Sequence, residues 1–490
     1  MLQGIAREAP KKVERSCTPW WLLNLTSLAS TFIVTVTPNT DAQLKLTPFH
    51  LARISLPSRR NHKNRSVTFP ILAGRNSTMM KPILYCLAAA SCGVFSPALH
   101  AEENWNQFRG PLGTGHSADK NVPVKWDKSS IIWKCELLGE GQSSPVNWGD
   151  KLFLTSSSKD GATRHVVCVD RNKGAILWRK QVAVAKPETP HRMNSFATSS
   201  CAITSDRVLA FFGPGGLHCY DHDGNIQWSE TLGDFPGPWG VAASPIIVGD
   251  LVIQNCDTAG PSKLVAFDIG SGKERWSSER VEKPKGGWST PILIKHEAKQ
   301  ELVLNGEFGV RSYDPKTGKE LWFCKGFNGR GTPVPDFANG LVYVVNGKPG
   351  DCYAVTPGGS GDVTESKMKF HAKRRGGRDL ASPVAVGDYL FVTSMSGVGT
   401  LYDSKSGDPI WEERLDGDFA ASPMVANGLI YLQTVSGGET LVIKPGKELE
   451  IVSRNSLGTD KQELFRATLA PIEGQLFTRS ASVLYCIGGK

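Results

Sequence analysis

Hydrophobic and polar residues alternate in short runs along much of the chain, as in KLFLTSS, DLVIQNC, LVYVVNG, YLFVTSM and LIYLQTV. A period of two places successive side chains on opposite faces of a strand, so each run predicts a β-strand with two different faces. The chain also holds 51 glycines and 30 prolines, which favour turns between such strands. The pattern therefore predicts an all-β fold built from many short strands.

One strand–turn–strand phrase recurs along the chain. It reads AFDIGSGKERW at 266–276, SYDPKTGKELW at 312–322 and LYDSKSGDPIW at 401–411. In the first copy Gly272 can adopt the positive φ that the turn needs, and the closing tryptophan supplies a large apolar ring with one N–H donor. Because the position repeats, we expect these rings to join neighbouring units rather than to form one active site. The docking tryptophans are Trp133, Trp178, Trp228, Trp276, Trp322 and Trp411.

Two independent markers give the number of units. Phe370 and Ile451 stand at the spacing of two missing tryptophans, which makes eight closing positions. A second marker, similar to SPVxxGD, opens the units at Ser144, Ser200, Ser244, Thr290, Thr332, Ser382, Ser422 and Thr468. Units of roughly 40–50 residues with four strands are typical of propeller blades. The sequence therefore predicts an eight-bladed β-propeller of four-stranded antiparallel blades.

The two markers are out of phase at the ends of this region. Trp133 has no opening marker before it, and Thr468 has no closing strand after it. We therefore expect the strand at 131–137 to complete the last blade, whose inner strands lie within 466–488, because this pairing closes the ring and removes open sheet edges. The propeller is expected to span residues 102–490.

The N-terminal region differs from the rest in charge. Residues 1–101 hold 12 Lys or Arg and 3 Asp or Glu, which accounts for the net charge of +9, so the remaining chain is neutral and offers no basic field for nucleic acid. Residues 79–101 have the form of a secretory signal peptide that begins at Met79 or Met80, which predicts a periplasmic or secreted protein. Residues 1–78 are interpreted as a non-native or disordered extension. A membrane anchor at 20–36 and lipidation at Cys92 are alternatives.

Eight of the eleven cysteines follow the signal segment. Cys168, Cys219 and Cys486 occupy one position of the repeat, where other blades place Ala, Ser, Leu or Val, so we interpret them as small buried hydrophobic residues. Export would allow some pairs to oxidise, but equivalent positions in separate blades disfavour a disulfide framework.

Taken together, the repeats resemble those of the PQQ-type (quinoprotein-like) β-propellers, whose motif A-x-D-x-x-[ST]-G-x-x-x-W is matched at 266–276. The run NWNQFRGPLGTGHS at 104–117 is similar to the W-x-Q-[FW]-R-G-P-x-x-x-G segment of bacterial exported members. The resemblance covers residues 102–490 and is specific for the fold. The group includes quinoprotein alcohol and glucose dehydrogenases and also a non-catalytic outer-membrane assembly lipoprotein, so the resemblance does not decide the activity.

The residues favour a non-catalytic role. For the alcohol dehydrogenases, the resemblance implies PQQ at the axis, Ca²⁺ beside it and a disulfide between adjacent cysteines, but this sequence has no Cys-Cys pair and no motif that fixes calcium ligands. It also has no GxSxG, HExxH or phosphate-binding glycine-loop motif. We expect a monomeric, exported binding scaffold of the bacterial cell envelope, without a cofactor, metal or membrane span, that engages an envelope protein or extracellular polymer. The alternative is a PQQ- and Ca²⁺-dependent dehydrogenase of alcohols or sugars.

The candidate ligand face follows from the topology. Loops that enter the innermost strands of a propeller converge around one mouth of its axial channel, and here they carry PHRMNSF, DFPGPWG, KGGWS, FNGRG and KRRGGRD. Aromatic rings beside arginines suit a protein hot spot, a carbohydrate or an anionic ligand. A solvated loop with a local Arg378–Asp379 ion pair is the alternative. The candidate residues are Trp239, Trp288, Arg330, Arg375, Arg378 and Asp379.

Overall fold

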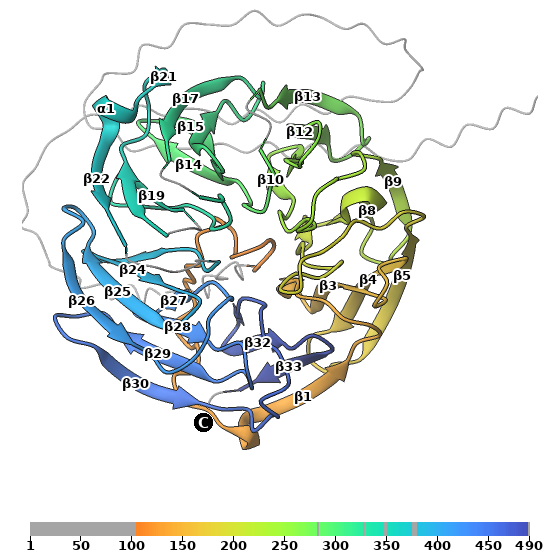
Figure 1. Ribbon diagram of the computed structural model, residues 1–490. Helices are drawn as coiled ribbons and strands as arrows, with labels where there is room; N and C mark the ends of the chain where they lie inside the picture. Colours follow the sequence, from red (N-terminus) through yellow and green to blue (C-terminus); the bar gives the residue numbers. More distant parts are fainter. Residues whose placement is uncertain (1–103, 282–283, 327–328, 347–349, 375–379, 489–490) are drawn as a thin grey trace, which may run out of the picture. The chain divides into compact units, whose positions relative to one another are not determined.

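Eight antiparallel sheets are arranged as the blades of a ring around a central axis (Figure 1). The computed structural model describes residues 104–281, 284–326, 329–346, 350–374 and 380–488. The expected extension at 1–78, the signal segment at 79–101 and Cys92 lie outside the described residues. Within the described residues, no helix is long and apolar enough to cross a membrane.

Each blade contains four strands, which follow the chain outward from the axis, except that β1 supplies the outer strand of the last blade. The innermost strands are β2 (Val146–Trp148), β6 (Ala202–Ile203), β10 (Ile246–Val248), β14 (Ile292–His296), β18 (Asp336–Ala338), β23 (Val384–Val386), β27 (Met424–Ala426) and β31 (Ala470–Ile472). The second strands are β3 (Lys151–Ser157), β7 (Val208–Phe211), β11 (Leu251–Asn255), β15 (Lys299–Gly306), β19 (Leu341–Val345), β24 (Tyr389–Thr393), β28 (Leu429–Gln433) and β32 (Gln475–Arg479).

The third strands are β4 (Thr163–Asp170), β8 (Leu217–Tyr220), β12 (Lys263–Asp268), β16 (Gly309–Tyr313), β20 (Cys352–Val355), β25 (Val398–Asp403), β29 (Thr440–Lys444) and β33 (Val483–Ile487). The outer strands are β5 (Ile176–Ala183), β9 (Ile226–Glu230), β13 (Glu274–Glu279), β17 (Glu320–Lys325), β22 (Met368–Ala372), β26 (Pro409–Arg414), β30 (Glu450–Asn455) and β1 (Ile131–Glu136). The short elements outside this scheme are β21 (Gly361–Asp362), α1 (Thr364–Lys367), η1 (Lys128–Ser130) and η2 (Gly213–Gly215).

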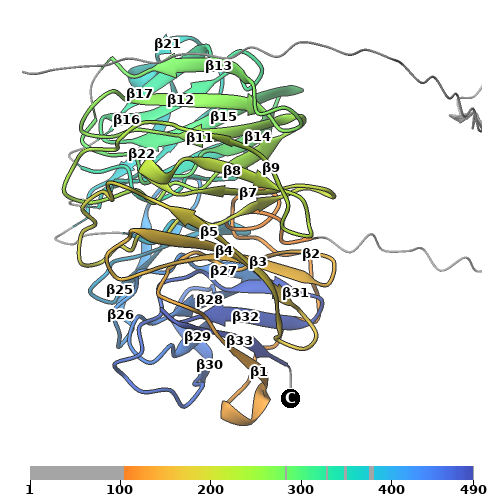
Figure 2. The same cartoon turned by 90° about the vertical axis from the view of Figure 1, so that its right-hand side faces the viewer.

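The ring closes as the sequence predicts. Strand β1 pairs antiparallel with β33, with Trp133 opposite Cys486 and Glu136 opposite Val483, so it supplies the outer strand of the last blade. Figure 2 shows the blades edge-on, with the sheet β2–β5 between the sheet β6–β9 and the strands β31–β33. The predicted eight-bladed, four-stranded propeller and its closure are both confirmed. Buried hydrophobic clusters lie between the facing sheets of neighbouring blades.

A β-bulge in the outer strand orients the side chain at each docking position. Ala266 pairs with Trp276 and Phe267 pairs with Glu274, so Arg275 is an extra residue in the outer strand. The other blades shift register at the equivalent place. Because a bulge locally increases twist, it turns the following ring toward the next blade.

Five of the six named tryptophans donate their Nε1–H to a backbone carbonyl in the phrase turn of the next blade. The acceptors are Arg171 for Trp133, His222 for Trp178, Ile269 for Trp228, Pro315 for Trp276 and Gly446 for Trp411, at 2.7–3.2 Å. The turn glycine supplies the space for the ring, because a Cβ on Gly272 would lie 2.7 Å from Cδ2 of Trp228. The phrase therefore joins adjoining blades through both a hydrogen bond and close packing.

Trp322 departs from this expectation. Its Nε1–H donates to Oε2 of Glu301 at 2.6 Å, within its own blade, and the ring is fully buried. The same carboxylate oxygen accepts from Ser312 Oγ at 2.8 Å. The following blade does not repeat the phrase, and its β21 instead pairs in parallel with β17, with Gly361 opposite Trp322.

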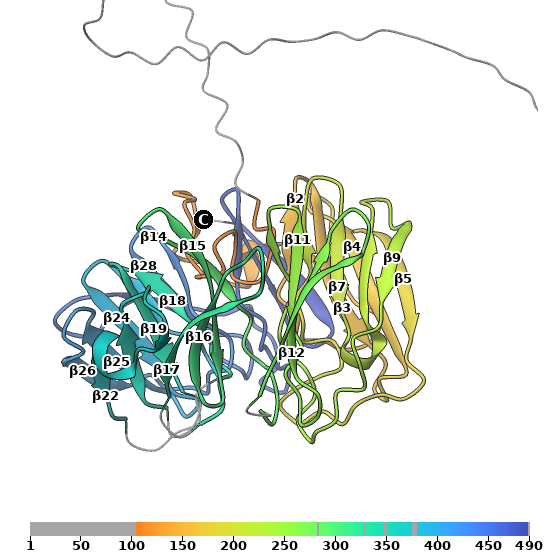
Figure 3. The ribbon, with the colours of Figure 1, turned by 90° about the horizontal axis from the view of Figure 1, so that it is seen from above.

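The N-terminal segment at 104–126 lies near β2 and β14 at one end of the axis (Figure 3). This end is opposite the loops that connect each outer strand to the innermost strand of the next blade. Asn147 N–H donates to the Trp105 carbonyl, and Ile203 N–H donates to that of Asn106. Gly110 has a φ of +81°, and a Cβ there would lie 2.5 Å from the Trp105 ring, so this tight turn requires glycine. The segment spans several innermost strands and brings Phe108 to the axis.

Candidate functional site

A pocket of about 170 Å³ opens at the axial mouth, where each outer strand connects to the innermost strand of the next blade. All eight of these connections contribute to its wall, and Phe108 contributes from the N-terminal segment. Residues of these connections that line the pocket include Gln142, Ser144, His191, Asn194, Trp239, Ser244, Trp288, Arg330, Thr332, Leu380, Ser382, Ala420, Ser422, Arg466 and Thr468. The pocket is therefore a property of the whole ring.

Hydroxyl contacts at six of the eight blade junctions surround the pocket, and they explain the Ser or Thr of the opening marker at those junctions. At six junctions a backbone N–H of one blade donates to the marker hydroxyl of the next, at 2.8–3.1 Å. The donor–acceptor pairs are Thr468–Ser144, Ser144–Ser200, Ser200–Ser244, Ser244–Thr290, Val334–Ser382 and Ser382–Ser422. The marker residues thus lock blade to blade at the axis and place small hydroxyls on the pocket wall.

Three of the sequence-predicted site residues come together at the mouth. The rings of Trp239 and Trp288 meet edge to face, with centroids 5.7 Å apart and an interplanar angle of 78°. The guanidinium carbon of Arg330 lies 3.9 Å from the Trp239 ring centroid, a cation–π geometry. These side chains come from three successive connections, so the cluster forms only when the blades assemble. The other three candidates, Arg375, Arg378 and Asp379, lie outside the described residues.

Burial, a hydrogen bond and two adjacent glycines hold Trp288 in place. It is 9% exposed and its Nε1–H donates to the Gly240 carbonyl at 3.0 Å. A Cβ on Gly286 would lie 2.2 Å from the Trp288 ring, and one on Gly287 would lie 2.5 Å from Cβ of Asp257. The two glycines of KGGWS therefore let the chain fold tightly against this ring and the neighbouring hairpin.

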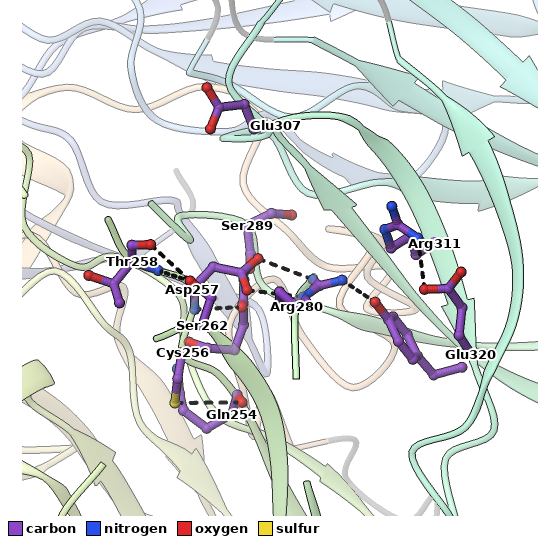
Figure 4. Close-up of polar contacts among 12 residues, drawn as sticks. Gln254, Cys256, Asp257, Thr258, Ser262, Arg280, Ser289, Glu307, Arg311 and Glu320 are labelled. Carbon is purple, nitrogen blue, oxygen red and sulfur yellow. Dashed lines mark hydrogen bonds and ion pairs between the residues drawn. The ribbon is translucent and has the colours of Figure 1, made fainter. Parts of the chain in front are cut away.

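A polar network beside this loop joins the blade β10–β13 to the blade β14–β17 (Figure 4). The Arg280 guanidinium donates to both carboxylate oxygens of Asp257, at 3.0 and 3.1 Å, and to Tyr313 Oη. Both side chains of the ion pair are almost fully buried. The adjoining hollow measures about 10 Å³, the volume that about one water needs. We interpret the network as a structural support for the connection that carries Trp288.

The sequence analysis missed Asn194, although it lies in the loop PHRMNSF. The Asn194 amide nitrogen donates to the carbonyls of Trp239 at 2.8 Å and Val241 at 3.1 Å. Its carbonyl oxygen accepts from Ser195 N–H and from Thr198 Oγ1. Asn194 therefore fixes the loop that carries Trp239. Its place in a mouth loop was the signal that could have identified it.

Arg466 was also missed. It lies in the last connection, it is half-buried, and it has no hydrogen bond or ion pair with any described residue. Burial lowers the pKa of its guanidinium, and no carboxylate among the described residues opposes that shift. Arg466 stands two residues before the opening marker Thr468, as Arg330 stands before Thr332, and this repeat position was the signal that could have identified it.

The pocket wall is cationic and polar on one part and apolar on another. Arg330 and Arg466 carry positive charge, whereas the described wall contains no Asp or Glu. Trp239, Trp288, Met193 and Leu380 supply apolar surface. Among the described residues, no cluster of His, Cys, Asp or Glu could hold a metal ion. The eight described cysteines are all buried and free.

The comparison with protein families identifies one match over most of the propeller. The family model described as outer membrane protein assembly factor BamB matches residues 115–303 and 306–447. BamB from Burkholderia pseudomallei (strain K96243) is 28% identical over 104 residues, which cover 21% of this chain and 23% of that protein.

Similarity extends to a larger enzyme and to a solved structure. Quinohemoprotein alcohol dehydrogenase ADH IIB from Pseudomonas putida is 23% identical over 380 residues, which cover 70% of this chain and 54% of the dehydrogenase. The chain thus spans about half the length of that enzyme. The crystal structure of BamB from Moraxella catarrhalis matches with a TM-score of 0.55 at 16% identity, covering 74% of this chain and 97% of that one. This likeness shows the fold.

Proposed function

Because the chain belongs to the BamB family of PQQ-type propellers, we propose that it is an exported, non-catalytic binding propeller of the cell envelope. Its axial mouth engages another molecule, either an envelope protein or an extracellular polymer. The signal-like segment at 79–101 and the outer-membrane role in the name of the BamB relative support the location.

One observation carries the binding role: Arg330 stacks on Trp239 at the rim of a pocket to which all eight interblade connections contribute. Tryptophan and arginine are enriched in binding hot spots because they bury large areas at low entropic cost while offering directional contacts. A rigid ring of blades holds this rim, so little ordering is needed when a ligand binds.

A PQQ- and Ca²⁺-dependent dehydrogenase is the second candidate, favoured by the similarity to ADH IIB. Calcium takes six to eight oxygen ligands, and carboxylates usually contribute several of them. The described wall offers hydroxyl, amide and carbonyl oxygens but no carboxylate, so this donor set does not fit a calcium-bound quinone. The absence of a Cys-Cys pair in the sequence points the same way.

Affinity capture from envelope extracts tests the binding role. Wild-type protein, Trp239→Ala and Arg330→Ala are used as baits, with Arg275→Ala as the matched control, because Arg275 is an exposed arginine at the opposite end of the blades. We expect the partner to be lost with both mouth variants and retained with Arg275→Ala. Equal recovery with all four baits would contradict the assignment of the mouth.

A second experiment separates binding from catalysis. Purified protein is incubated with PQQ and Ca²⁺, and quinone absorbance and alcohol- or sugar-dependent dye reduction are recorded. The proposal expects no turnover. Stoichiometric PQQ binding with turnover would replace it with the dehydrogenase.

A further inference from the structure

The axial pocket contains a positive charge, that of Arg466, which no described residue balances. Two buried arginines elsewhere have carboxylate partners: Arg164 pairs with Glu188, and Arg280 pairs with Asp257. Arg109 donates only from Nη2, to the carbonyls of Thr114 and Pro383, and its Nε and Nη1 have no partner. Arg479 has no carboxylate partner, but it donates to the carbonyls of Thr155 and Ala481. Arg466 has neither kind of contact with the described residues and lines the pocket. None of its guanidinium nitrogens is sealed from solvent, so the group can offer its N–H donors and its charge to a ligand in the pocket.

The hydroxyl ring adds hydrogen-bond donors to this charge. Ser144 Oγ accepts the Thr468 N–H, and Ser244 Oγ accepts the Ser200 N–H. A hydroxyl that accepts from a backbone N–H still has its own proton to donate. For Ser144 and Ser244 no described residue accepts that proton, and both residues line the pocket. The wall therefore offers donors around a cationic centre, which suits an anionic oxygen ligand.

The remaining pocket surface indicates a ligand with an apolar part in addition to its anionic group. Trp239, Trp288, Met193 and Leu380 form apolar wall, and a volume of about 170 Å³ exceeds what a bare carboxylate fills. The guanidinium of Arg330 is stacked on the Trp239 ring, which leaves that of Arg466 to face an anion. One guanidinium matches a single negative charge better than the dianion of a phosphate monoester.

On these grounds, and resting on the proposed binding role of the mouth, we propose that the pocket binds a carboxylate attached to an apolar or aromatic body. Arg466 is the partner of the carboxylate, and the edge-to-face pair Trp239–Trp288 contacts the body. Two sources carry this chemistry: a free aromatic acid, and the C-terminal end of a polypeptide whose last side chain is apolar.

Calorimetric titration of the purified chain tests the charge requirement. The probes are N-acetylphenylalanine, its uncharged amide and phenyl phosphate. We expect N-acetylphenylalanine to bind at least tenfold more tightly than either of the others. Equal affinity for acid and amide would overturn the proposal, and a preference for phenyl phosphate would replace the carboxylate with a phosphate. A decapeptide that ends in phenylalanine identifies the source: tighter binding than N-acetylphenylalanine indicates a polypeptide end, and weaker binding indicates a free acid.

Variants of Arg466 test its role. Arg466→Gln should weaken binding of N-acetylphenylalanine at least tenfold, Arg466→Lys should keep part of the affinity, and Arg275→Gln should have no effect. The melting temperature of ligand-free Arg466→Gln should equal or exceed that of the wild type, because the substitution removes a half-buried charge that makes no hydrogen bond or ion pair with the described residues. Unchanged affinity, or a lowered melting temperature, would show that Arg466 is not the anion partner. If these titrations fail while partner capture still depends on the mouth residues, the binding role stands and the carboxylate ligand is refuted.

Discussion

The backbone N–H of Thr468 donates a hydrogen bond of 2.9 Å to Oγ of Ser144, a residue 324 positions earlier in the chain. This contact joins the innermost strand of the last blade to that of the first, and both residues are almost fully buried. The ring is therefore closed at the axis by this contact and at its outer edge by the pairing of β1 with β33.

Ser144→Ala should destabilise the protein because it leaves the Thr468 N–H buried without an acceptor. We expect the free energy of unfolding to fall by about 1–3 kcal/mol, the usual effect of such an orphaned donor. Urea unfolding measures the change. Ser277→Ala, an exposed serine on β13, is the control and should leave the midpoint unchanged. Identical midpoints for the two variants would show that the Thr468–Ser144 bond is not needed for closure.

Gly272→Ala should destabilise the protein more than Gly340→Ala. Both glycines have nearly the same φ, +72° and +73°, so the cost of the left-handed backbone, about 1–2 kcal/mol, is shared. A Cβ on Gly272 collides with the Trp228 ring, whereas nothing lies within 4 Å of one on Gly340. Urea midpoints of the two variants isolate the contribution of the docked ring.

A double variant checks this interpretation. In a Trp228→Leu background the ring is absent, so Gly272→Ala should cost no more than Gly340→Ala does. An undiminished cost in that background would place the effect in the turn itself rather than in the contact between blades.

The repeat made the fold predictable because the same physical requirements recur in most of the eight blades. A glycine turn, a docked ring and a small hydroxyl each recur, and the phase difference between the first and last markers indicated closure. Trp322 could not be predicted, because its partner Glu301 lies on another strand and the phrase itself is unchanged. The mouth residues Trp239, Trp288 and Arg330 followed from topology, since loops before innermost strands must converge. The isolation of Arg466 is a three-dimensional property without a local signature.

Trp322→Phe should be more destabilising than Trp411→Phe. Both substitutions keep an aromatic ring and remove one N–H donor. At Trp411 the acceptor is the partly exposed Gly446 carbonyl, which water can reach, so we expect a loss of about 1 kcal/mol. At Trp322 the acceptor is the buried Glu301 carboxylate, so we expect about 3 kcal/mol.

Glu301→Gln provides the control for that comparison. The uncharged amide needs less stabilisation, so Trp322→Phe should cost less in this background than in the wild type, measured by urea unfolding at neutral pH. A cost that is the same in both backgrounds would refute the role of the carboxylate and leave ring packing as the explanation.

The stability of the protein should fall at alkaline pH because of its buried thiols. Burial raises the pKa of the Cys201 thiol from its ordinary value of 9.0 to about 12. Burial also raises the pKa of Cys168 and Cys486 to about 12. Between pH 9 and pH 12 the folded chain therefore binds more protons than the unfolded chain, so the free energy of unfolding decreases as pH rises, by up to about 1.4 kcal/mol per pH unit for each such thiol.

Urea unfolding between pH 8 and pH 11 measures how the free energy of unfolding depends on pH. Cys201→Ala should reduce this slope by the contribution of one thiol, independently of its effect on stability at pH 8. Burial raises the pKa of Tyr220 to about 12, and Cys201 raises it as well, so Tyr220 shifts stability in the same direction. The difference between the two proteins therefore reports Cys201 together with its coupling to Tyr220. A thiol reagent should label Cys201 at neutral pH only after urea unfolds the chain, because the residue is completely buried. Rapid labelling of the folded protein, or an identical slope in Cys201→Ala, would show that Cys201 is not held as a buried, protonated thiol.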